Sequence, residues 1–430
     1  MIFGGLVLLM VIGMPVAFGF LLVSLVGAFF LWGGEIGLRQ FVLSIRDSLS
    51  IFTLLPVPLF ILMGEIMYQS GIAPFMLDAV EKWLGRMPGR LGLVSVAGGA
   101  LLSTLTGSSM ATTAVLGDVQ VPEMERRGYK KPMSLGPILG SGGLAIMIPP
   151  SDLAVLLGAI GHISIGKILV GIVFPGLLMA VLYASYIILR CKLQPSIAPP
   201  YEVTPTSFLG KLEATVRHIV PLGFIVFLVV GVIFIGVATP TEAAASGAIG
   251  CFILAAIYRR LNWEMVKRSV SGALKVAVMC FMIIAVAKAF GNILAFSGAS
   301  QGLIKLAIGL PLDPIFILIA MQVVLLIMGC FMDVVAIMMI TLPLFMPIID
   351  TLGFDPVWFA IIFLLNIEMA GTTPPFGLNL FVMKGVAPRD TTMGDIYRAG
   401  LPFLGCDLVA MILIFVFPSI ALWLPEVMRG

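Results

Sequence analysis

The sequence predicts an all-α polytopic membrane protein built from two inverted-topology repeats, each with a re-entrant helical hairpin and a broken helix. Hydrophobic residues make up 60% of its 430 positions and charged residues only 11%, a balance far from that of soluble domains. Apolar runs long enough to span a bilayer recur from end to end, as in helical proteins that cross the membrane many times. The net charge of +3 is too small to indicate a nucleic-acid partner.

A repeated pattern of prolines and glycines divides the chain in two. Pro15, Pro122, Gly128, Pro149 and Pro150 match, at one common offset of 225 positions, Pro240, Pro347, Gly353, Pro374 and Pro375. One match would carry little weight among 47 glycines and 28 prolines, but five in order indicate a duplication. We therefore expect a first repeat over 1–190, a cytoplasmic linker over 191–217 and a second repeat over 218–430.

The basic residues predict that the two repeats are inverted. Loops on the cytoplasmic side of a membrane are enriched in lysine and arginine. The segments 72–90 and 122–133 of the first repeat hold seven of these residues, whereas their counterparts 299–314 and 348–356 hold only Lys305. The first pair is therefore expected inside the cell and the second pair outside. This arrangement is typical of secondary transporters, whose substrate site lies where the repeats meet.

The segment 91–121 is predicted to be the first re-entrant hairpin. It is too short for two spans, which need about 40 residues, and a single span would place one of its two basic flanks outside. Nine of the seventeen residues in Leu101–Gly117 (LLSTLTGSSMATTAVLG) are Gly, Ser or Thr. We expect the chain to turn near Gly107 at mid-membrane, because non-helical backbone at that depth has to be shielded by protein or line a wet cavity.

A broken helix over 134–165 is expected after this hairpin, because the stretch SGGLAIMIPPSD at 141–152 contains a double proline. Two prolines remove hydrogen-bond donors and clash with the preceding turn, so the helix cannot continue through them. The second repeat is expected to contain the same two elements. They are a hairpin over 314–349 that turns near Gly329–Asp333 and a broken helix over 357–384. Free carbonyls and half-helix ends are expected at the depth of the hairpin tips.

The other elements follow from the same apolar and basic patterns. The remaining expected spans are 2–14, 15–32, 50–71, 167–190, 218–239, 241–257, 272–298 and 398–425. Linkers are expected over 72–90 and 258–270, and the amphipathic segment 33–49 is expected to lie on the membrane surface.

Six short motifs give the chain a family resemblance. They are Gly13–Phe18 (GMPVAF), Thr106–Thr112 (TGSSMAT), Gly143–Pro150 (GLAIMIPP), Ala238–Ala244 (ATPTEAA), Met332-Asp333 and Gly371–Gly377 (GTTPPFG). None of them is specific alone. Together they make the chain resemble, over essentially its whole length, the large membrane subunit of a tripartite ATP-independent periplasmic (TRAP) transporter.

The resemblance implies sodium-coupled secondary active uptake of a small organic acid, a carboxylate or a sulfonate. It implies an elevator mechanism, in which a transport domain carrying both hairpins moves against a scaffold. The implied partners are a small four-helix membrane subunit and a periplasmic substrate-binding protein, both expected to be separate polypeptides. The implied location is the bacterial inner membrane, with many passes through the lipid bilayer. Na+ is the expected coupling ion, and no organic cofactor is expected.

The hairpin tips and the helix breaks supply the candidate site residues. Hydroxyls and unwound carbonyls offer Na+ the oxygen ligands it prefers, and half-helix N-termini suit a substrate carboxylate. The candidate substrate-binding residues are Ser108, Ser109, Pro149, Pro150, Ser151, Thr373, Pro374 and Pro375. The candidate Na+ ligands, partly through backbone carbonyls, are Gly107, Ser108, Gly142, Gly329, Asp333, Gly371 and Thr372.

Structural roles compete with these assignments. A carboxylate at mid-bilayer is costly and usually pairs with a cation, but Asp333 could instead hydrogen-bond to its own hairpin turn. Hydroxyl residues at the first tip could serve as small packing residues. Glu65 and Lys288 lie near the ends of spans. A charged side chain there can snorkel to the membrane surface, which explains these two residues as well as a functional role does.

Three rival functions make different demands on the sequence. An intramembrane aspartyl protease would need a Gly-x-Gly-Asp motif, but Val115, Leu116 and Gly117 precede Asp118. No Ser-His or HExxH arrangement occurs either, so the chain is not expected to be an enzyme. A channel rarely needs inverted hairpins. The alternative that stays open is a stand-alone sodium/dicarboxylate symporter of related architecture, which would work without a receptor.

Overall fold

The structure of the protein is a computed structural model that describes residues 4–6, 9, 12, 14, 16–201, 207–298, 301–302, 304–305, 309, 311–330, 332 and 334–428. Within these residues the secondary structure is helical, without β-strands. Six helices in this part of the chain are long and apolar enough to cross a membrane, or up to eight if two bent helix pairs each form one span. The prediction of an all-α polytopic membrane protein is therefore confirmed.

The first half of the chain contains ten described helices. They are α2 (Val16–Leu31), α3 (Glu35–Leu49), α4 (Pro56–Ser70), α5 (Ala73–Trp83), α6 (Arg90–Thr106), α7 (Ser109–Arg126), α8 (Lys131–Met147), α9 (Asp152–Gly161), α10 (Ile165–Gly171) and α11 (Val173–Leu193). The chain reverses direction between α6 and α7. It bends by 42° between α8 and α9, at the double proline.

The second half begins with a continuous helix from Phe208 to Phe234, which includes α12 (Phe208–Ala214), α13 (Val220–Val226) and α14 (Val232–Phe234). The helices that follow are α15 (Pro240–Ile257), α16 (Trp263–Phe296), α18 (Pro314–Gly329), α19 (Val334–Leu352), α20 (Pro356–Thr372), α21 (Leu378–Val386), α22 (Met393–Val416) and α23 (Ser419–Val427). The order hairpin, helix, break, helix thus occurs in both halves, as α6–α9 and as α18–α21.

Some boundaries differ from those expected. The segment 72–90 contains α5, and the helix from Phe208 begins inside the expected linker 191–217. The segment 258–270 is not a linker throughout, because α16 begins at Trp263 and continues for 34 residues. Asn262 caps this helix by accepting a hydrogen bond from the Met265 amide at 2.8 Å. Charged residues end an apolar run without ending a helix. The hydropathy pattern therefore placed the starts of these helices too far along the sequence.

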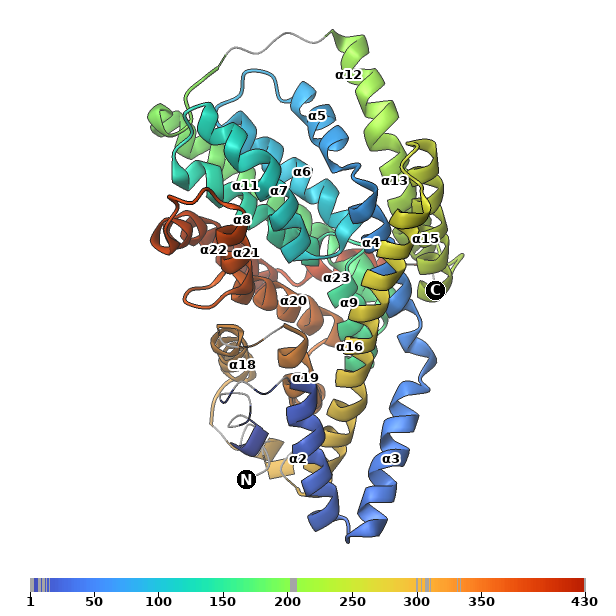
Figure 1. Cartoon of the computed structure of the whole chain (residues 1–430). Helices are drawn as coiled ribbons and strands as arrows, with labels where there is room; N and C mark the ends of the chain where they lie inside the picture. The colour runs from blue at the N-terminus through green and yellow to red at the C-terminus, as the bar shows by residue number, and fades with distance from the viewer. Residues whose placement is uncertain are drawn as a thin grey trace.

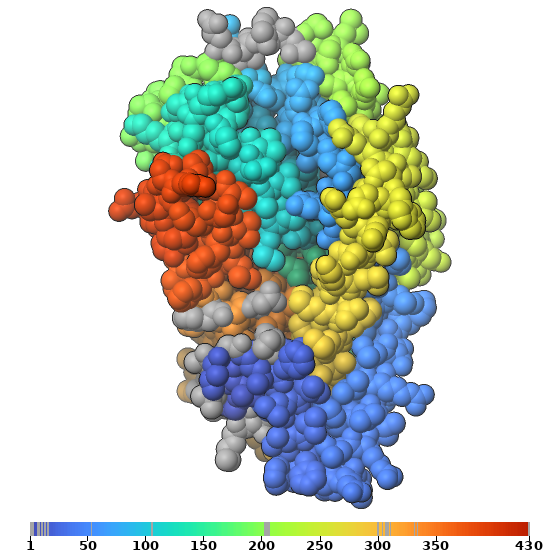
Figure 2. Space-filling view, viewed as in Figure 1, coloured from blue at the N-terminus to red at the C-terminus, as the bar shows by residue number. Residues whose placement is uncertain are grey.

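The helices form two groups. In one group α4 packs against α15 and α16, and α16 also packs against α2 and α3 (Figure 1). In the other group α8 packs against α6, α7, α11 and α22, and α20 packs against α8, α18 and α22. The space-filling view shows α16 as a continuous yellow strip that reaches the blue N-terminal helices at one end of the molecule (Figure 2). The groups meet where α4 and α16 contact α6, α9 and α19.

Ion pairs fix the end of the first hairpin that is farthest from its tip. Arg90 at the start of α6 pairs with Glu81 of α5 at 3.2 Å. At the end of α7, Arg127 pairs with Glu123 at 2.5 Å. At the start of α8, Lys131 pairs with Asp390 at 3.0 Å, and this hydrogen-bonded ammonium lowers the pKa of the Asp390 carboxyl below its ordinary value. Arg127 also lies 3.8 Å from Glu81, so Glu81 joins this end of both hairpin arms to α5.

Candidate functional site

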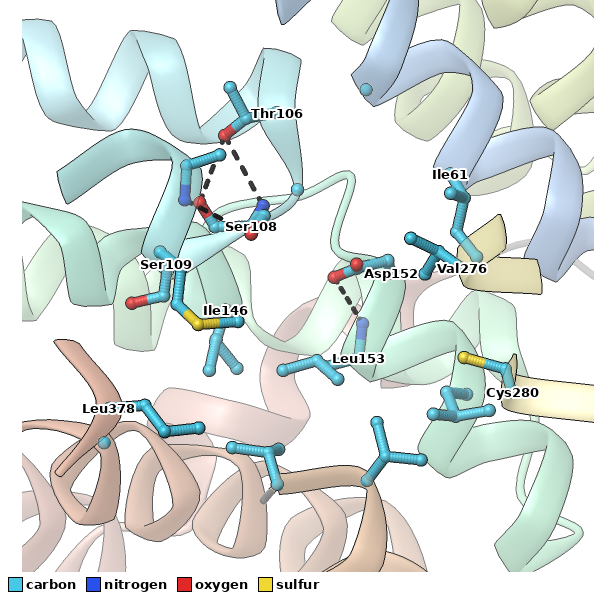
Figure 3. A pocket seen from close by; sticks show the side chains of 18 of the residues that line it. Ile61, Thr106, Ser108, Ser109, Ile146, Asp152, Leu153, Val276, Cys280 and Leu378 are labelled. Carbon is cyan, nitrogen blue, oxygen red and sulfur yellow. Dashed lines mark hydrogen bonds between the residues drawn. The ribbon is translucent and has the colours of Figure 1, made fainter. Parts of the chain in front are cut away.

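A cavity of about 310 Å³ lies where the two groups of helices meet. Four helices begin at its wall, because the first residues of α7, α9, α19 and α21 all line it: Ser109, Asp152, Val334 and Leu378. The first group of helices forms one wall through α4 and α16, which contribute Ile61, Val276 and Cys280 among others (Figure 3). The hairpin tips and the helix breaks of both halves therefore meet at one place.

The tip of the first hairpin is a glycine turn followed by a capped helix. Gly107 has a φ of 58°, a left-handed conformation that favours glycine, and it ends α6. Ser108 then caps α7 by accepting a hydrogen bond from the Ala111 amide at 3.4 Å. The Thr106 and Thr112 hydroxyls lie 2.8 Å apart and close the turn from the side. Gly107, Ser108 and Ser109 all line the cavity.

The first helix break repeats this capping arrangement. Ser151 caps α9 by accepting a hydrogen bond from the Ala154 amide at 3.3 Å, in a backbone conformation nearly the same as that of Ser108. Asp152 is the first residue of α9 and faces the cavity (Figure 3). Ser151 is fully buried. Pro149 lines a different, largely apolar cavity of about 360 Å³ beside Ile148.

The second helix break contributes one predicted residue to the cavity wall, Gly371. The hydroxyls of Thr372 and Thr373 both donate to the Met369 carbonyl, at 3.1 and 2.6 Å. The carbonyl of Pro374 accepts a hydrogen bond from the Cys330 thiol at 3.6 Å. The carbonyl of Pro375 accepts one from the Tyr397 hydroxyl at 2.8 Å. Two of the carbonyls expected to be free at this break therefore have protein donors.

Two of the predicted Na+ ligands are glycines at close helix contacts. A Cβ on Gly142 of α8 would lie 2.0 Å from the Thr113 Oγ1 of α7, and a Cβ on Gly329 of α18 would lie 2.0 Å from the Ala370 Cβ of α20. Neither glycine is among the residues that line the cavity. Their absent side chains let the hairpins pack closely on the broken helices. Asp333 lies outside the residues that the structure describes.

Several polar residues of the cavity wall had no place in the predicted site, and three of them lie on or beside the broken helices. Asp152, Glu368 and Asn379 line the cavity, and Asn379 donates a hydrogen bond to the Ser109 Oγ at 2.6 Å. Ser109 and Asn379 are 270 residues apart, so this contact joins the two halves. Asp152 lies two residues after the first double proline, and Asn379 lies four residues after the second. Their positions near the helix breaks are the feature of the sequence that could have identified them as site residues.

The charges around the cavity are of two kinds. The backbone amides at the starts of four helices create a positive field that suits an anion. Three carboxylates, those of Glu65, Asp152 and Glu368, also line the wall, and no lysine, arginine or histidine does so among the described residues. Among the described residues the wall therefore offers an anion helix starts but no basic side chain.

Comparison with known proteins decides the family. The sequence model of the tripartite ATP-independent periplasmic transporter, DctM component, matches residues 3–420. The chain belongs to the DctM family of TRAP transporter components. The family resemblance inferred from the six motifs is confirmed. This DctM-family protein is thus a multi-pass membrane transport component and not an enzyme.

Two curated relatives illustrate the range of the DctM family. The protein is 33% identical over 391 residues to the C4-dicarboxylate TRAP transporter large permease protein DctM of Pseudomonas aeruginosa, with 90% of each chain covered. It is 31% identical over 428 residues to the isethionate TRAP transporter permease protein DctMQ of Oleidesulfovibrio alaskensis. That alignment covers 98% of this chain but only 65% of the relative.

One solved structure shows the same fold. The crystal structure of the Alcanivorax borkumensis YdaH transporter, described as having an unusual topology, superposes with a TM-score of 0.64 over 90% of each chain. The sequence identity is 16%. The likeness therefore shows that this DctM-family chain shares its fold with that protein.

Proposed function

We propose that the chain is the permease for sodium-coupled secondary active uptake of a small organic acid, either a carboxylate or a sulfonate. The observation that carries this proposal is the convergence of four helix starts on one cavity between the two groups of helices. Helix N-termini bind carboxylates and similar anions through their free amides and their dipoles. The printed names of two relatives, which refer to C4-dicarboxylates and to isethionate, support the same ligand class.

Sodium coupling is proposed because the cavity wall is acidic. An organic anion would face the carboxylates of Glu65 and Asp152, and bound cations would offset that repulsion. The proposed ligands are the oxygen atoms of the hairpin tips and helix breaks that the sequence predicted. Of these, Gly107, Ser108 and Gly371 line the cavity. Binding the anion and Na+ in one cavity would make each favour the other, which is the basis of symport.

An elevator mechanism is proposed from the two groups of helices. The group built on α4 and α16 would form the scaffold, and the group that contains both hairpins and both broken helices would form the transport domain. The cavity lies at the contact between them, where a displacement of one group would expose it to either side of the membrane. Ser108 and Ser109 would contact the substrate from the transport side.

The proposed partners are a periplasmic substrate-binding protein and a small four-helix membrane subunit, in the bacterial inner membrane. Exposed apolar side chains are continuous along the helix from Phe208 to Phe234, whose residues include Phe208, Leu209, Phe224 and Phe227 at 52–76% exposure. Such a surface suits lipid or another membrane helix. The alternative of a stand-alone sodium/dicarboxylate symporter predicts uptake without any receptor.

A reconstituted system can separate these two functions. The large subunit, its small membrane partner and the receptor encoded beside them are placed in proteoliposomes, and uptake of a labelled ligand of that receptor is measured. We expect uptake to require the receptor and to be unchanged by ATP. Equal uptake with the receptor left out would contradict the receptor-dependent mechanism and support the stand-alone symporter.

A further inference from the structure

Two carboxylates are buried together inside the second group of helices. Glu368 of α20 and Asp407 of α22 are each 2% exposed, and they are close enough to interact electrostatically. Neither forms a salt bridge within the described part of the chain, where all ion pairs involve other residues. Burying two unpaired negative charges side by side is very costly, so at least one positive charge has to accompany them.

The two carboxylates have different surroundings. Asp407 accepts a hydrogen bond from the buried hydroxyl of Tyr183, which stabilises a charged carboxylate. The Glu368 Oε2 is buried and has no hydrogen-bond partner. This difference assigns the negative charge of the pair to Asp407.

Another unpartnered acceptor lines the same cavity as Glu368. The Asn379 side chain donates through Nδ2 to the Ser109 Oγ, while the Asn379 Oδ1 is buried without a donor. The Ser109 hydroxyl interacts in turn with the Glu368 carboxylate. Both Glu368 Oε2 and Asn379 Oδ1 are acceptors, so they cannot satisfy each other unless a hydrogen atom lies between them.

We propose that Glu368 holds a proton at neutral pH and that this proton closes a hydrogen-bonded ring with Asn379 and Ser109. Glu368 donates to the Asn379 Oδ1, Asn379 donates to Ser109, and Ser109 donates to Glu368. One proton thereby satisfies both unpartnered atoms and removes one of the two buried charges. The ring joins α7 of the first hairpin to α20 and α21 of the second broken helix.

Within the described residues, none of the basic groups on the elements around Glu368 forms an ion pair with it. Several charged or titratable groups lie on or next to the helices that pack against α20. They are Lys131 of α8, Asp152 of α9 and His162 directly after it, Lys167 of α10, Asp350 of α19, Lys384 of α21, Asp395, Tyr397, Arg398, Cys406 and Asp407 of α22, and Glu426 of α23. The interactions resolved for the Glu368 carboxylate are with Asp407, Tyr183 and Ser109. Gly143 of α8 makes room for it, since a Cβ there would lie 2.1 Å from the Glu368 Oε1.

The proton would act at the wall of the transport cavity. Glu368, Ser109 and Asn379 all line that cavity, so loss of the proton would open the ring between the two halves at the place where substrate binds. The folded protein would hold a proton that the unfolded chain releases at neutral pH. Its stability should therefore fall as the pH rises.

Infrared spectroscopy tests the proton directly. The purified membrane complex is compared with its Glu368→Gln variant at neutral pH in potassium buffer. We expect the wild type to show a protonated-carboxyl band that the variant lacks. The matched control is Asp118→Asn, which changes an exposed carboxylate on α7 and should leave the band unchanged. A spectrum of Glu368→Gln that retains the whole band would overturn the proposal, because Glu368 would then be a charged acceptor.

Thermal stability provides the second measurement. Between mildly acidic and mildly alkaline pH we expect the wild-type Tm to fall by about 2 °C, the scale of one hydrogen bond in a chain of this size. Glu368→Gln keeps a donor toward Asn379, so its Tm should be independent of this proton, and Ser109→Ala should reduce the pH dependence because it opens the ring. If Na+ raises the wild-type Tm at alkaline pH and Glu368→Gln abolishes that rise, Glu368 is a cation ligand and the ring is wrong.

Discussion

Gly329→Ala is expected to lower the Tm strongly, with a loss of about 1–3 kcal/mol in the free energy of unfolding. The new Cβ would lie 2.0 Å from the Ala370 Cβ and 3.1 Å from the Ala370 Cα. Alanine has no flexible side chain that could move aside, so the backbones of α18 and α20 would have to separate. The measurement is the Tm of the purified complex in detergent.

The matched control for Gly329→Ala is Gly223→Ala. Gly223 lies in α13 and is exposed, and no neighbouring atom lies within 4 Å of the position that a Cβ would occupy there. Alanine favours a helix over glycine by about 1 kcal/mol, so this variant should be as stable as the wild type or more so. Equal Tm values for the two variants would show that the hairpin does not need its close contact with α20.

Asp333→Asn is expected to weaken Na+ binding, so that the Na+ concentration needed for half-maximal uptake rises by about one to two orders of magnitude. The substitution removes a negative charge but preserves most of the side chain's shape, and losing one charge-assisted contact costs roughly 1.5–3 kcal/mol. Ser108→Ala removes a neutral ligand, whose net contribution is nearer 0.5–1.5 kcal/mol. Its shift should therefore be smaller. Both variants are measured by Na+-dependent uptake in proteoliposomes.

A structural role for Asp333 makes a different prediction. A carboxylate that only hydrogen-bonds to its own turn would leave the Na+ dependence of uptake unaltered when changed to asparagine, and the Tm would fall instead. The Tm of each variant is therefore measured beside its uptake. An unchanged half-saturation for Na+ in Asp333→Asn would remove this residue from the proposed ion site.

The turns and breaks of the fold were predictable because they depend on local chemistry. Gly107 ends α6 in a left-handed conformation, which glycine adopts at no steric cost. The double prolines at 149–150 and 374–375 interrupt two helices, as proline chemistry requires. The length of α16 was not predictable in the same way, because its charged first turns lowered the hydropathy without breaking the helix.

The cavity wall was predictable only in part, because it depends on contacts between distant segments. The sequence placed Ser108 and Ser109 at the hairpin tip, and both line the cavity. The hydrogen bond from Asn379 to Ser109 and the burial of Glu368 beside Asp407 depend on how α7, α20 and α22 pack. Gly142 and Gly329 stay predicted as ion ligands through their carbonyls, and the close helix contacts at both positions could not be predicted from the sequence.

The central claim is that a sodium gradient drives organic-acid uptake through this cavity. The most direct test is accumulation of labelled substrate in proteoliposomes that contain the complete complex and its receptor, with Na+ outside and K+ inside. We predict accumulation above equilibrium that collapses when K+ replaces Na+ on both sides. Undiminished accumulation with K+ on both sides would contradict sodium coupling.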